Sequence, residues 1–446
     1  MLPTFFDRKS ELNQLKKEFD RDEFRFILIY GRRRIGKTRL VKKAIEDNKS
    51  FYFLSKKTKP EKDLDRLINH FNKKFDINIT AETFEEFFEE LKKRFDNLIF
   101  CIDEFSFWVE KDDAICSTFQ IIIDEILKDT KIKLILLGSS ISIMESLLSY
   151  KNPLYGRSHT RINLSHVKIK ELLKEKNMSI KNSIKLYGLT NNIPAYMNEL
   201  NYNPTKDMIN KTFFNKYNLL NSDAERILKD EFRNYVLYLN ILFAISEGKT
   251  KLKEISNYTK TDISNISKYL KILETLRLIK REWPITINHK KPTKGIWKIN
   301  DFFFKFWMKF VYPNIEEIEL ENFKFKHIEK DFNRYLGFVF EEYIKELIKT
   351  IYPKFKFGRW WHKEKEIDIV GLNKREIIFS ECKYKDNVNP EKLYNKLKKK
   401  KNSVKWNKNN RKEKYILFAK SFNSNFKKDD LELIDFDKLK SLVINY

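Results

Sequence analysis

Two glycines, a lysine and a threonine near the start of the chain have the types and the spacing that bind phosphate. The segment reads Gly31-Arg32-Arg33-Arg34-Ile35-Gly36-Lys37-Thr38. Glycine lets the backbone turn tightly, so that successive N–H groups can surround phosphate oxygens. We expect Lys37 to reach the terminal phosphates of ATP and the Thr38 hydroxyl to ligate Mg²⁺. All eight residues are therefore predicted to form a nucleotide-binding loop.

The segments on either side of this loop fit that chemistry. Residues 24–30 are apolar and rich in β-formers, and residues 38–47 have helical periodicity. A strand, a glycine-rich loop and a helix in that order are the context in which this motif binds phosphate. The helix N-terminus adds partial positive charge. The chain has only 10 glycines, and two at the required positions favour a phosphate loop over a chance turn.

Two adjacent carboxylates follow another buried strand. Residues 98–102 (LIFCI) predict the strand, and Asp103 and Glu104 come directly after it. Asp103 would complete the Mg²⁺ site, and Glu104 would polarise the attacking water as general base. The alternative is an acidic turn that caps the next helix. A strand at 51–54 lies between the two motifs in the sequence, and this insertion suits the ATPase branch with an added central strand.

Polar residues farther along could contact the terminal phosphate. A strand at 133–137 is followed by Gly138, Ser139 and Ser140. Either serine could sense the γ-phosphate or hold the water, and both could instead cap a helix. Arg157 could act as an arginine finger that stabilises transition-state charge, in cis or, in a homo-oligomer, in trans. The alternative is a surface arginine in a turn.

A second set of candidates lies near the C-terminus. Residues 366–370 (EIDIV) and 379–383 (FSECK) contain Asp368, Glu381 and Lys383. They predict an antiparallel hairpin that turns near residues 373–374, in which Asp368 faces Phe379. Because strand side chains alternate, Glu381 and Lys383 share the face of Asp368.

This D…E-x-K pattern is suited to a divalent metal. Two close carboxylates repel each other unless a cation lies between them, and hard oxygen ligands select Mg²⁺ or Mn²⁺. The metal would activate water at a scissile phosphate and Lys383 would position that water, with Glu341 as a third carboxylate. The alternatives are a hairpin with ordinary surface charges and a nuclease-like fold that binds without cutting.

The elements that must position these residues predict several domains. Alternating strands and helices in the first part indicate a layered α/β domain, and helices, a winged helix-turn-helix and further strands follow. The predicted boundaries are 1–165 for the P-loop ATPase core, 166–230 for a helical lid, 231–300 for the winged helix-turn-helix, 301–330 for a helical connector and 331–446 for a nuclease-like α/β domain.

Charge and composition bear on the partners. The chain has 89 Lys and Arg against 63 Asp and Glu, a formal net charge of +26. Compositional bias of the genome or thermophily explains a global excess, but the basic run at 391–414 favours nucleic acid, with DNA as the favoured form. Residues 262–276 are the predicted recognition helix, with Ser264, Asn265, Ser267 and Lys268 on its polar face. The alternative is a protein-docking module.

Neither export nor membrane insertion is expected. No apolar run approaches a membrane span, the N-terminal segment lacks a signal core, and three cysteines do not suggest a disulfide framework. We expect a cytoplasmic protein.

Together these motifs carry a resemblance. The residues that carry it are Phe6-Asp7-Arg8, Tyr30 to Thr38, Ile102-Asp-Glu104, Leu137-Gly-Ser-Ser140 and Pro153 to Arg157, with the later Gly337, Glu341, Asp368 and Glu381-Cys-Lys383. In these segments the chain resembles archaeal P-loop ATPases of the AAA/STAND-related group. The C-terminal part is similar to PD-(D/E)xK nucleases. Asn191-Asn192 stands where the family's lid usually has a double glycine, and asparagine best replaces glycine where φ is positive.

The expected fold is thus an α/β P-loop ATPase core with a helical lid, a winged helix-turn-helix and a C-terminal restriction-endonuclease-like domain. The expected function is an ATPase that acts on nucleic acid and carries a Mg²⁺-dependent nuclease-like domain. The main alternative is a STAND-like regulatory or signalling ATPase whose C-terminal domain binds DNA or protein without cleavage. A third reading is an ATP-gated assembly or remodelling protein without a DNA ligand.

Overall fold

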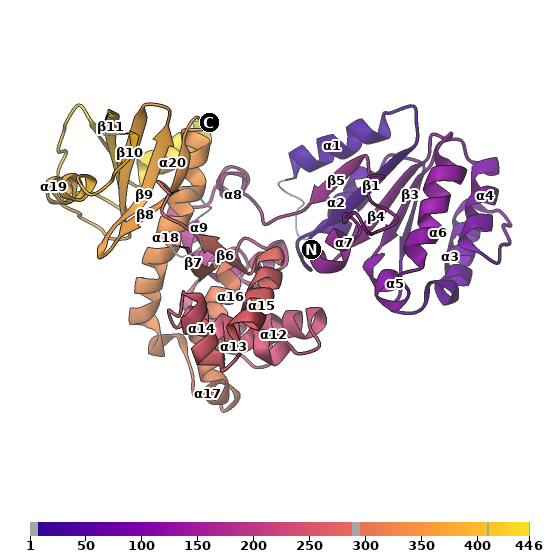
Figure 1. Ribbon diagram of the computed structural model, residues 1–446, viewed down its shortest axis with the longest axis horizontal. Helices are drawn as coiled ribbons and strands as arrows, with labels where there is room; N and C mark the ends of the chain where they lie inside the picture. The colour runs from indigo at the N-terminus through magenta and orange to yellow at the C-terminus, as the bar shows by residue number, and fades with distance from the viewer. Residues whose placement is uncertain (1–7, 288–294, 408–409, 446) are drawn as a thin grey trace. The chain divides into compact units, whose positions relative to one another are not determined.

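The chain folds into two compact units, Met1–His166 and Val167–Tyr446. The computed structural model describes residues 8–287, 295–407 and 410–445 (Figure 1). Phe6 and Asp7, together with residues 408–409 of the basic run, lie outside the described residues. No helix in the described ranges is long and apolar enough to cross a membrane.

The first unit is a three-layer α/β domain. Its described elements are α1 (Lys9–Phe19), β1 (Arg25–Tyr30), α2 (Lys37–Ala44), β2 (Ser50–Leu54), α3 (Pro60–Phe75), α4 (Phe84–Arg94), β3 (Ile99–Asp103), α5 (Ser106–Lys111), α6 (Ile115–Ile121) with a π-helical continuation (Ile122–Leu127), β4 (Lys133–Gly138), α7 (Ile141–Ser146) and β5 (Thr160–Asn163).

The sheet of this unit is parallel, with strand order β2-β3-β4-β1-β5. The strand between the phosphate-loop strand β1 and the acidic strand β3 is therefore β4. The sheet thus has the added central strand that suits this ATPase branch, but this strand is β4, whereas the strand at 51–54 is β2 and lies at the edge. Sequence order could not reveal this, because a parallel crossover can skip a position in the sheet. The short edge strand β5 was not predicted.

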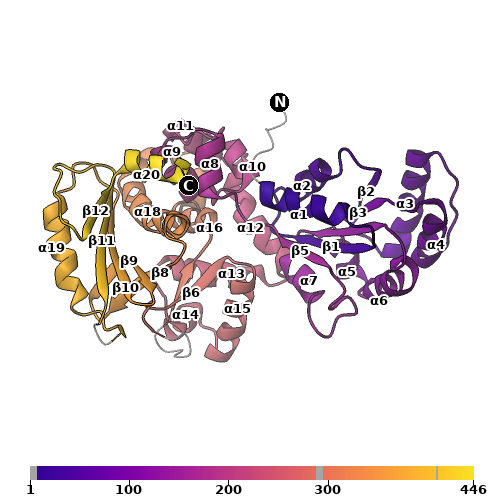
Figure 2. The same ribbon diagram turned by 90° about the horizontal axis from the view of Figure 1, so that it is seen from above.

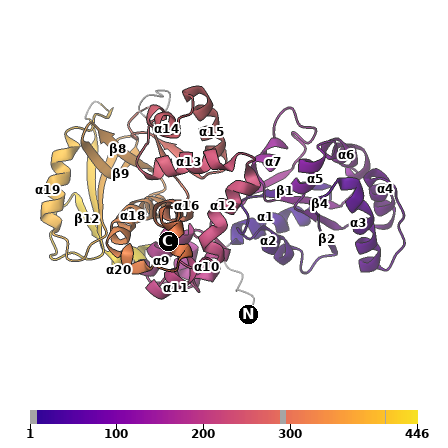
Figure 3. The same cartoon turned by 90° about the horizontal axis from the view of Figure 1, so that it is seen from below.

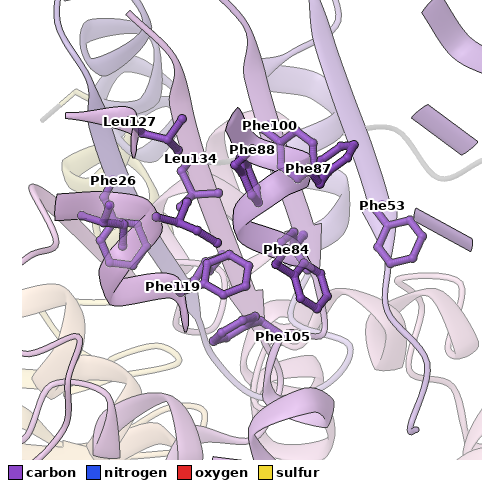
Figure 4. Close-up of a cluster of buried hydrophobic side chains, with 14 of the residues drawn as sticks. Phe26, Phe53, Phe84, Phe87, Phe88, Phe100, Phe105, Phe119, Leu127 and Leu134 are labelled. Atoms are coloured by element: carbon purple, nitrogen blue, oxygen red, sulfur yellow. The ribbon is translucent and has the colours of Figure 1, made fainter. Parts of the chain in front are cut away.

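An aromatic core covers one face of this sheet (Figure 4). Phe26, Phe53 and Phe100 of the strands belong to this core with Phe84, Phe87 and Phe88 of α4. The ring centre of Phe100 lies 5.9 Å from that of Phe87 and 5.0 Å from that of Phe88. Alternate residues such as Ile27 and Ile29 are also fully buried, on the opposite face. Strands covered on both sides must be apolar at every position, which explains why they could be read from the sequence.

The second unit begins with helices. Its described helical elements are α8 (Ile169–Glu175), α9 (Ile180–Thr190), α10 (Pro194–Glu199), α11 (Lys206–Thr212), α12 (Leu219–Glu231), α16 (Phe302–Phe306) with a π-helical continuation (Trp307–Val311), short 3₁₀ turns (Tyr312–Asn314 and Phe325–His327) and α17 (Ile315–Glu319). Asn191 and Asn192, at the end of α9, have φ of 52° and 51°. The backbone of this turn thus keeps the left-handed conformation that favours glycine.

A winged helix-turn-helix follows within this unit. It consists of α13 (Tyr235–Ser246), α14 (Leu252–Thr259), α15 (Ile263–Thr275) and the antiparallel strands β6 (Ile279–Glu282) and β7 (Ile296–Ile299). Ile266, Leu270 and Leu273 of α15 are buried. They hold this helix against its neighbours and leave its other side exposed.

The last part is a mixed five-stranded sheet with order β12-β11-β10-β9-β8. Its elements are α18 (Glu329–Ile351), β8 (Lys356–His362), β9 (Lys365–Asn373), β10 (Glu376–Lys383), α19 (Pro390–Lys401), β11 (Lys412–Ala419), β12 (Leu431–Ile434) and α20 (Phe436–Asn445). β8, β9 and β10 are antiparallel neighbours, whereas β10, β11 and β12 run parallel. Helices α18 and α19 cover opposite faces (Figures 2 and 3).

Candidate functional site

The phosphate loop lies at the carboxyl end of β1, where α2 begins. Gly31 and Gly36 have φ of 152° and 98°, and Arg34 has 67°. A Cβ at Gly31 would lie 2.5 Å from the Leu164 carbonyl oxygen, so this glycine is required for close packing as well as for its φ. The Lys37 ammonium donates to the carbonyl of Gly31 at 2.8 Å and to that of Arg32 at 3.3 Å. The loop thus folds around the lysine that should contact phosphate.

The N-terminal segment supports the loop from outside. The Arg8 guanidinium donates to the Ile35 carbonyl at 3.3 Å and to the Ser165 carbonyl at 2.6 Å. Arg8 is buried. It therefore holds the loop to the segment after β5. Arg32 and Arg33, which complete the predicted loop, lie between the two glycines.

Asp103 ends strand β3 beside the first turn of α2. The Thr38 hydroxyl donates to Asp103 Oδ2 at 2.5 Å, which joins the two predicted metal ligands. The Tyr52 hydroxyl, from β2, donates to the same oxygen at 2.6 Å. Burial, and then this hydrogen bond, raise the pKa of the Tyr52 phenol. Asp103 is 1% exposed, so a hydroxyl and a buried carboxylate offer hard oxygen donors that fit Mg²⁺. The sequence did not reveal Tyr52, because only the sheet order brings β2 beside β3.

Glu104 is bound to the end of the neighbouring strand β4. Its Oε2 accepts hydrogen bonds from the backbone N–H of Ser139 at 3.1 Å and from the Ser139 hydroxyl at 2.6 Å. Glu104 has a φ of 59°, and its carbonyl accepts from the Ser55 hydroxyl at 2.8 Å. A non-glycine residue in this conformation is costly unless its surroundings hold it. Of the two candidate serines, Ser139 is the one that contacts the predicted base.

Arg157 is engaged elsewhere in the same unit. Its Nε lies 2.9 Å and 2.8 Å from the two carboxylate oxygens of Asp124, and its Nη2 lies 2.7 Å from Asp124 Oδ2. Another of its nitrogens donates to the Pro153 carbonyl. This geometry matches the turn-anchoring alternative. To act as an arginine finger, Arg157 would first have to leave Asp124.

The C-terminal hairpin differs from its predicted register. Asn373 pairs with Glu376, so Phe379 faces Val370 and not Asp368. Continued by one residue, the register sets Asp368 opposite Glu381. The turn centre lies one residue later than predicted, and this shifts each facing pair by two residues. A shift of two leaves every side chain on its original face, and Asp368, Glu381 and Lys383 do converge.

Ion pairs and a backbone hydrogen bond hold these carboxylates. Asp368 Oδ2 accepts from the Cys382 N–H at 2.9 Å, and the Lys383 ammonium lies 3.1 Å from Glu381 and 3.6 Å from Asp368. Lys400 of α19 reaches both oxygens of Glu381 at 2.9 Å. No sequence signal distinguishes Lys400 from the neighbouring lysines of α19. Only its position around the helix directs it to Glu381.

Glu341 lies near these groups without completing a ligand set. Burial, and then Asp368, raise the pKa of Glu341 to about 7; burial, and then Glu381, raise the pKa of Asp368. Within the described ranges, no three His, Cys, Asp or Glu side chains are grouped to hold a metal ion. Lys383 and Lys400 pair with Glu381 instead, and the expected three-carboxylate metal site stays a prediction.

Comparisons with known proteins agree with this architecture. Residues 5–200 match a family described as an ATPase domain predominantly from Archaea. Residues 239–281 match a family described as bacterial regulatory proteins of the arsR family, and residues 307–414 match archaeal and bacterial proteins of unknown function.

Individual proteins are similar to different shares of the chain. An uncharacterized protein of Methanocaldococcus jannaschii (MJECL04) is 37% identical over 393 residues, which are 86% of this chain and 88% of the relative. An uncharacterized ATP-binding protein of the same organism (MJ0423) is 44% identical over 45 residues, 10% of this chain and 76% of its own length. The solved Walker-type ATPase of Pyrococcus abyssi is 18% identical, with a TM-score of 0.48, over 68% of this chain and 96% of its own.

The phosphate loop, the acidic strand β3 and the parallel sheet thus define a P-loop ATPase with a winged helix. The chain belongs to the same family as the Methanocaldococcus jannaschii protein that it matches over most of its length.

Proposed function

We propose that this ATPase acts on nucleic acid, with duplex DNA as its favoured partner and Mg²⁺–ATP as its working nucleotide. The observation that carries the proposal is the free side of the recognition helix α15. Its polar residues Ser264, Asn265, Ser267 and Lys268 are all exposed. Hydrogen-bonding side chains on one helix of a winged helix are what reads a major groove, and the net charge of +26 favours the approach to phosphates.

At the nucleotide site, each residue has a distinct proposed role. Lys37 and the N–H groups of the loop bind the phosphates, and the hydroxyl of Thr38 and the carboxylate of Asp103 would hold Mg²⁺. The metal, when bound, neutralises charge on the phosphate oxygens. Glu104 accepts the proton of the attacking water, and Ser139, which donates to Oε2, orients the carboxylate so that Oε1 faces that water.

DNA binding by α15 is tested with the double variant Asn265→Ala/Lys268→Ala. We expect affinity for duplex DNA to fall at least tenfold, and log K of the unaltered protein to fall with log salt by about 0.9 per phosphate contacted. The matched control is Lys330→Ala, which removes an exposed lysine from the first turn of α18. Affinity that does not change with salt, or equal affinity in the double variant, would show that the winged helix docks protein, as in the regulatory alternative.

A second candidate function is metal-dependent phosphodiester cleavage by the C-terminal sheet. It is supported by the convergence of Asp368, Glu381 and Lys383 on one sheet face, with a helix on each side of the sheet. Here Asp368 and Glu381 would hold Mg²⁺ or Mn²⁺ once Lys400 withdraws. The D…E-x-K resemblance favours this function, whereas the ion pairs of Glu381 favour binding without cleavage.

Cleavage assays on DNA and RNA substrates separate these outcomes. Purified protein is incubated with Mg²⁺ or Mn²⁺, with and without ATP, beside Glu381→Ala. The control is Glu376→Ala, at the far end of the same strand β10. Cleavage that requires metal and is lost only in Glu381→Ala supports a nuclease. Equal nucleic-acid binding by all three proteins without cleavage supports the binding alternative.

A further inference from the structure

A pocket of about 230 Å³ lies within the second unit, between the wing and the long helix α18. Its lining residues come from strands β6, β7 and β8 and from helices α13, α16 and α18, which Figures 1 and 2 label. It has no residue in common with the phosphate loop, which belongs to the first unit. None of the functions described above uses this pocket.

Ion pairs fix the walls of the pocket. Lys280 of β6 lies 2.8 Å from Glu342 of α18. Lys345 of α18 lies 3.1 Å from Glu282 of β6, which in turn lies 2.7 Å from Lys298 of β7. These groups are partly buried, and they join the wing to α18. A pocket whose walls are joined in this way is preformed, as most small-molecule sites are.

Positive charge predominates among the lining residues. The cations are Lys280, Lys298, Lys305, Lys309 and Arg359, and the anions are Glu341 and Glu342. Lys280, Lys298 and Arg359 each pair with a carboxylate. Lys305 does not: its ammonium lies 5.5 Å from the ring centres of Phe302 and Phe338, and it forms no ion pair within the described residues.

The surroundings of Lys305 disfavour its charge. Burial lowers the pKa of Lys305 to about 8, even though Glu342 acts in the opposite direction. Such an ammonium gains more from a bound anion than an exposed lysine does, because little water screens the pair. A ligand with negative charge would therefore be stabilised at this point of the pocket.

The aromatic side chains indicate what else the ligand carries. Phe338 is 47% exposed although it lines the pocket, and Trp297 of β7 lines it as well. Trp297 is buried, so Phe338 offers the exposed ring, and an exposed aromatic ring beside cations suits the stacking of a nucleobase. We propose that this pocket binds a nucleoside phosphate monoester, with the phosphate paired to Lys305 and the base against Phe338.

The phosphate monoester has two sources. It can belong to a free mononucleotide, or to the 5′-phosphorylated end of a nucleic-acid strand. Glu341 and Arg359 line the pocket, and both lie within electrostatic reach of Asp368. The pocket therefore borders the candidate carboxylate site, although the inference does not depend on cleavage there.

The test measures binding of AMP to the full chain by calorimetry, with the phosphate loop first saturated with ADP and Mg²⁺. We expect one AMP to bind per chain in addition to the ADP at the phosphate loop. The affinity for AMP should fall at least tenfold in Lys305→Met, which keeps the approximate length of the side chain and removes its charge. Adenosine should bind at least tenfold more weakly than AMP. The control is Lys330→Met, an exposed lysine outside the pocket. Thermal unfolding confirms that the variants are folded.

A second variant keeps the proposal testable if Lys305→Met does not fold. Phe338→Ala removes an exposed ring. It should weaken the binding of AMP without changing the affinity for inorganic phosphate. Oligonucleotides with a 5′-phosphate or a 5′-hydroxyl then distinguish the two sources of the phosphate. A preference for the phosphorylated strand that depends on Lys305 identifies a strand end as the ligand. Binding of AMP but of neither oligonucleotide identifies a free nucleotide. Absence of AMP binding at millimolar concentration, or equal affinity in the wild-type and altered proteins, overturns the proposal.

Discussion

Ser139 donates two hydrogen bonds to a single carboxylate oxygen of Glu104, from its backbone N–H at 3.1 Å and from its hydroxyl at 2.6 Å. The contact joins the ends of the adjacent strands β3 and β4. Glu104 and Ser139 are 35 residues apart in the sequence. Their contact gives the predicted general base one defined orientation.

Removing the hydroxyl should therefore slow turnover more than it weakens binding. In Ser139→Ala the N–H bond remains and the second bond, to a charged group, is lost. We expect kcat for ATP to fall about tenfold, which corresponds to about 1.4 kcal/mol, with nucleotide affinity unchanged. Ser140→Ala is the control, because the Ser140 hydroxyl lies 3.1 Å from that of Ser142 instead. Equal kcat in both variants would contradict this role.

Tyr52 should compete with the metal for Asp103. Its hydroxyl bonds the oxygen that Thr38 also contacts, so Tyr52→Phe frees an acceptor position on that carboxylate. We expect the Mg²⁺ concentration for half-maximal ATP turnover to decrease severalfold. The exposed Tyr217 supplies the control, Tyr217→Phe. A higher Mg²⁺ requirement would instead mean that Tyr52 orients Asp103 for the metal.

Variants at Arg157 and Asp124 distinguish an anchor from an arginine finger. If the bidentate pair only holds the turn, Arg157→Ala and Asp124→Ala should each lower the free energy of unfolding by about 1 kcal/mol. Neither variant should change the rate of ATP turnover. We expect this result from the geometry. A turnover loss in Arg157→Ala that Asp124→Ala does not share, and that depends on protein concentration, would support a finger supplied in trans.

The buried ion pairs beneath the wing should make stability depend on acid. Burial alone would raise the pKa of Glu282, but Lys345 and Lys298 outweigh it and lower the pKa to about 2. A depressed carboxyl pKa stabilises the fold above the pKa of the unfolded chain, and this contribution is lost as pH falls from about 4.5 toward 2. Glu282→Gln should cost about 3 kcal/mol at pH 7.

Thermal unfolding between pH 7 and pH 2 checks this prediction. The difference in stability between the wild-type protein and Glu282→Gln should shrink as the pH falls through that window. A difference that stays constant with pH would show that the carboxylate of Glu282 is not stabilised by its lysines.

Binding of AMP to the pocket should weaken in alkali. The groups that act on Lys305 are Glu342 and Glu341 of α18, Lys298 of β7 and Lys280 of β6. Since the charged ammonium binds the phosphate and its pKa is about 8, affinity should fall as pH rises from 7 to 9. In Lys305→Arg the side chain stays charged, so the slope should be much smaller. Equal slopes would assign the dependence to another group.

The sequence predicted those parts of the site that a few consecutive residues determine. Gly31, Gly36, Lys37 and Thr38 lie in one turn between β1 and α2, and local backbone geometry is what the motif alone can predict. Asp103 was found because a fully buried strand that ends in a carboxylate is unusual. The winged helix was found because its helices and strands follow one another along the chain.

Contacts between distant segments were beyond the sequence. Tyr52 reaches Asp103 only because β2 lies next to β3, and Lys400 reaches Glu381 only because α19 covers β10. The hairpin register was wrong by two residues, yet the shared face of Asp368 and Glu381 survived, since parity is unchanged by an even shift. The sequence could not show that lysines neutralise this site.

Steady-state ATP hydrolysis and ATP binding, measured together for the wild-type protein, Lys37→Ala and Glu104→Gln, test the central claim most directly. We predict that Lys37→Ala loses binding and turnover, because the phosphates lose the cation that the loop directs at them. Glu104→Gln should retain nucleotide affinity and lose turnover at least 100-fold. Wild-type turnover in Glu104→Gln, or unchanged affinity in Lys37→Ala, would contradict the account.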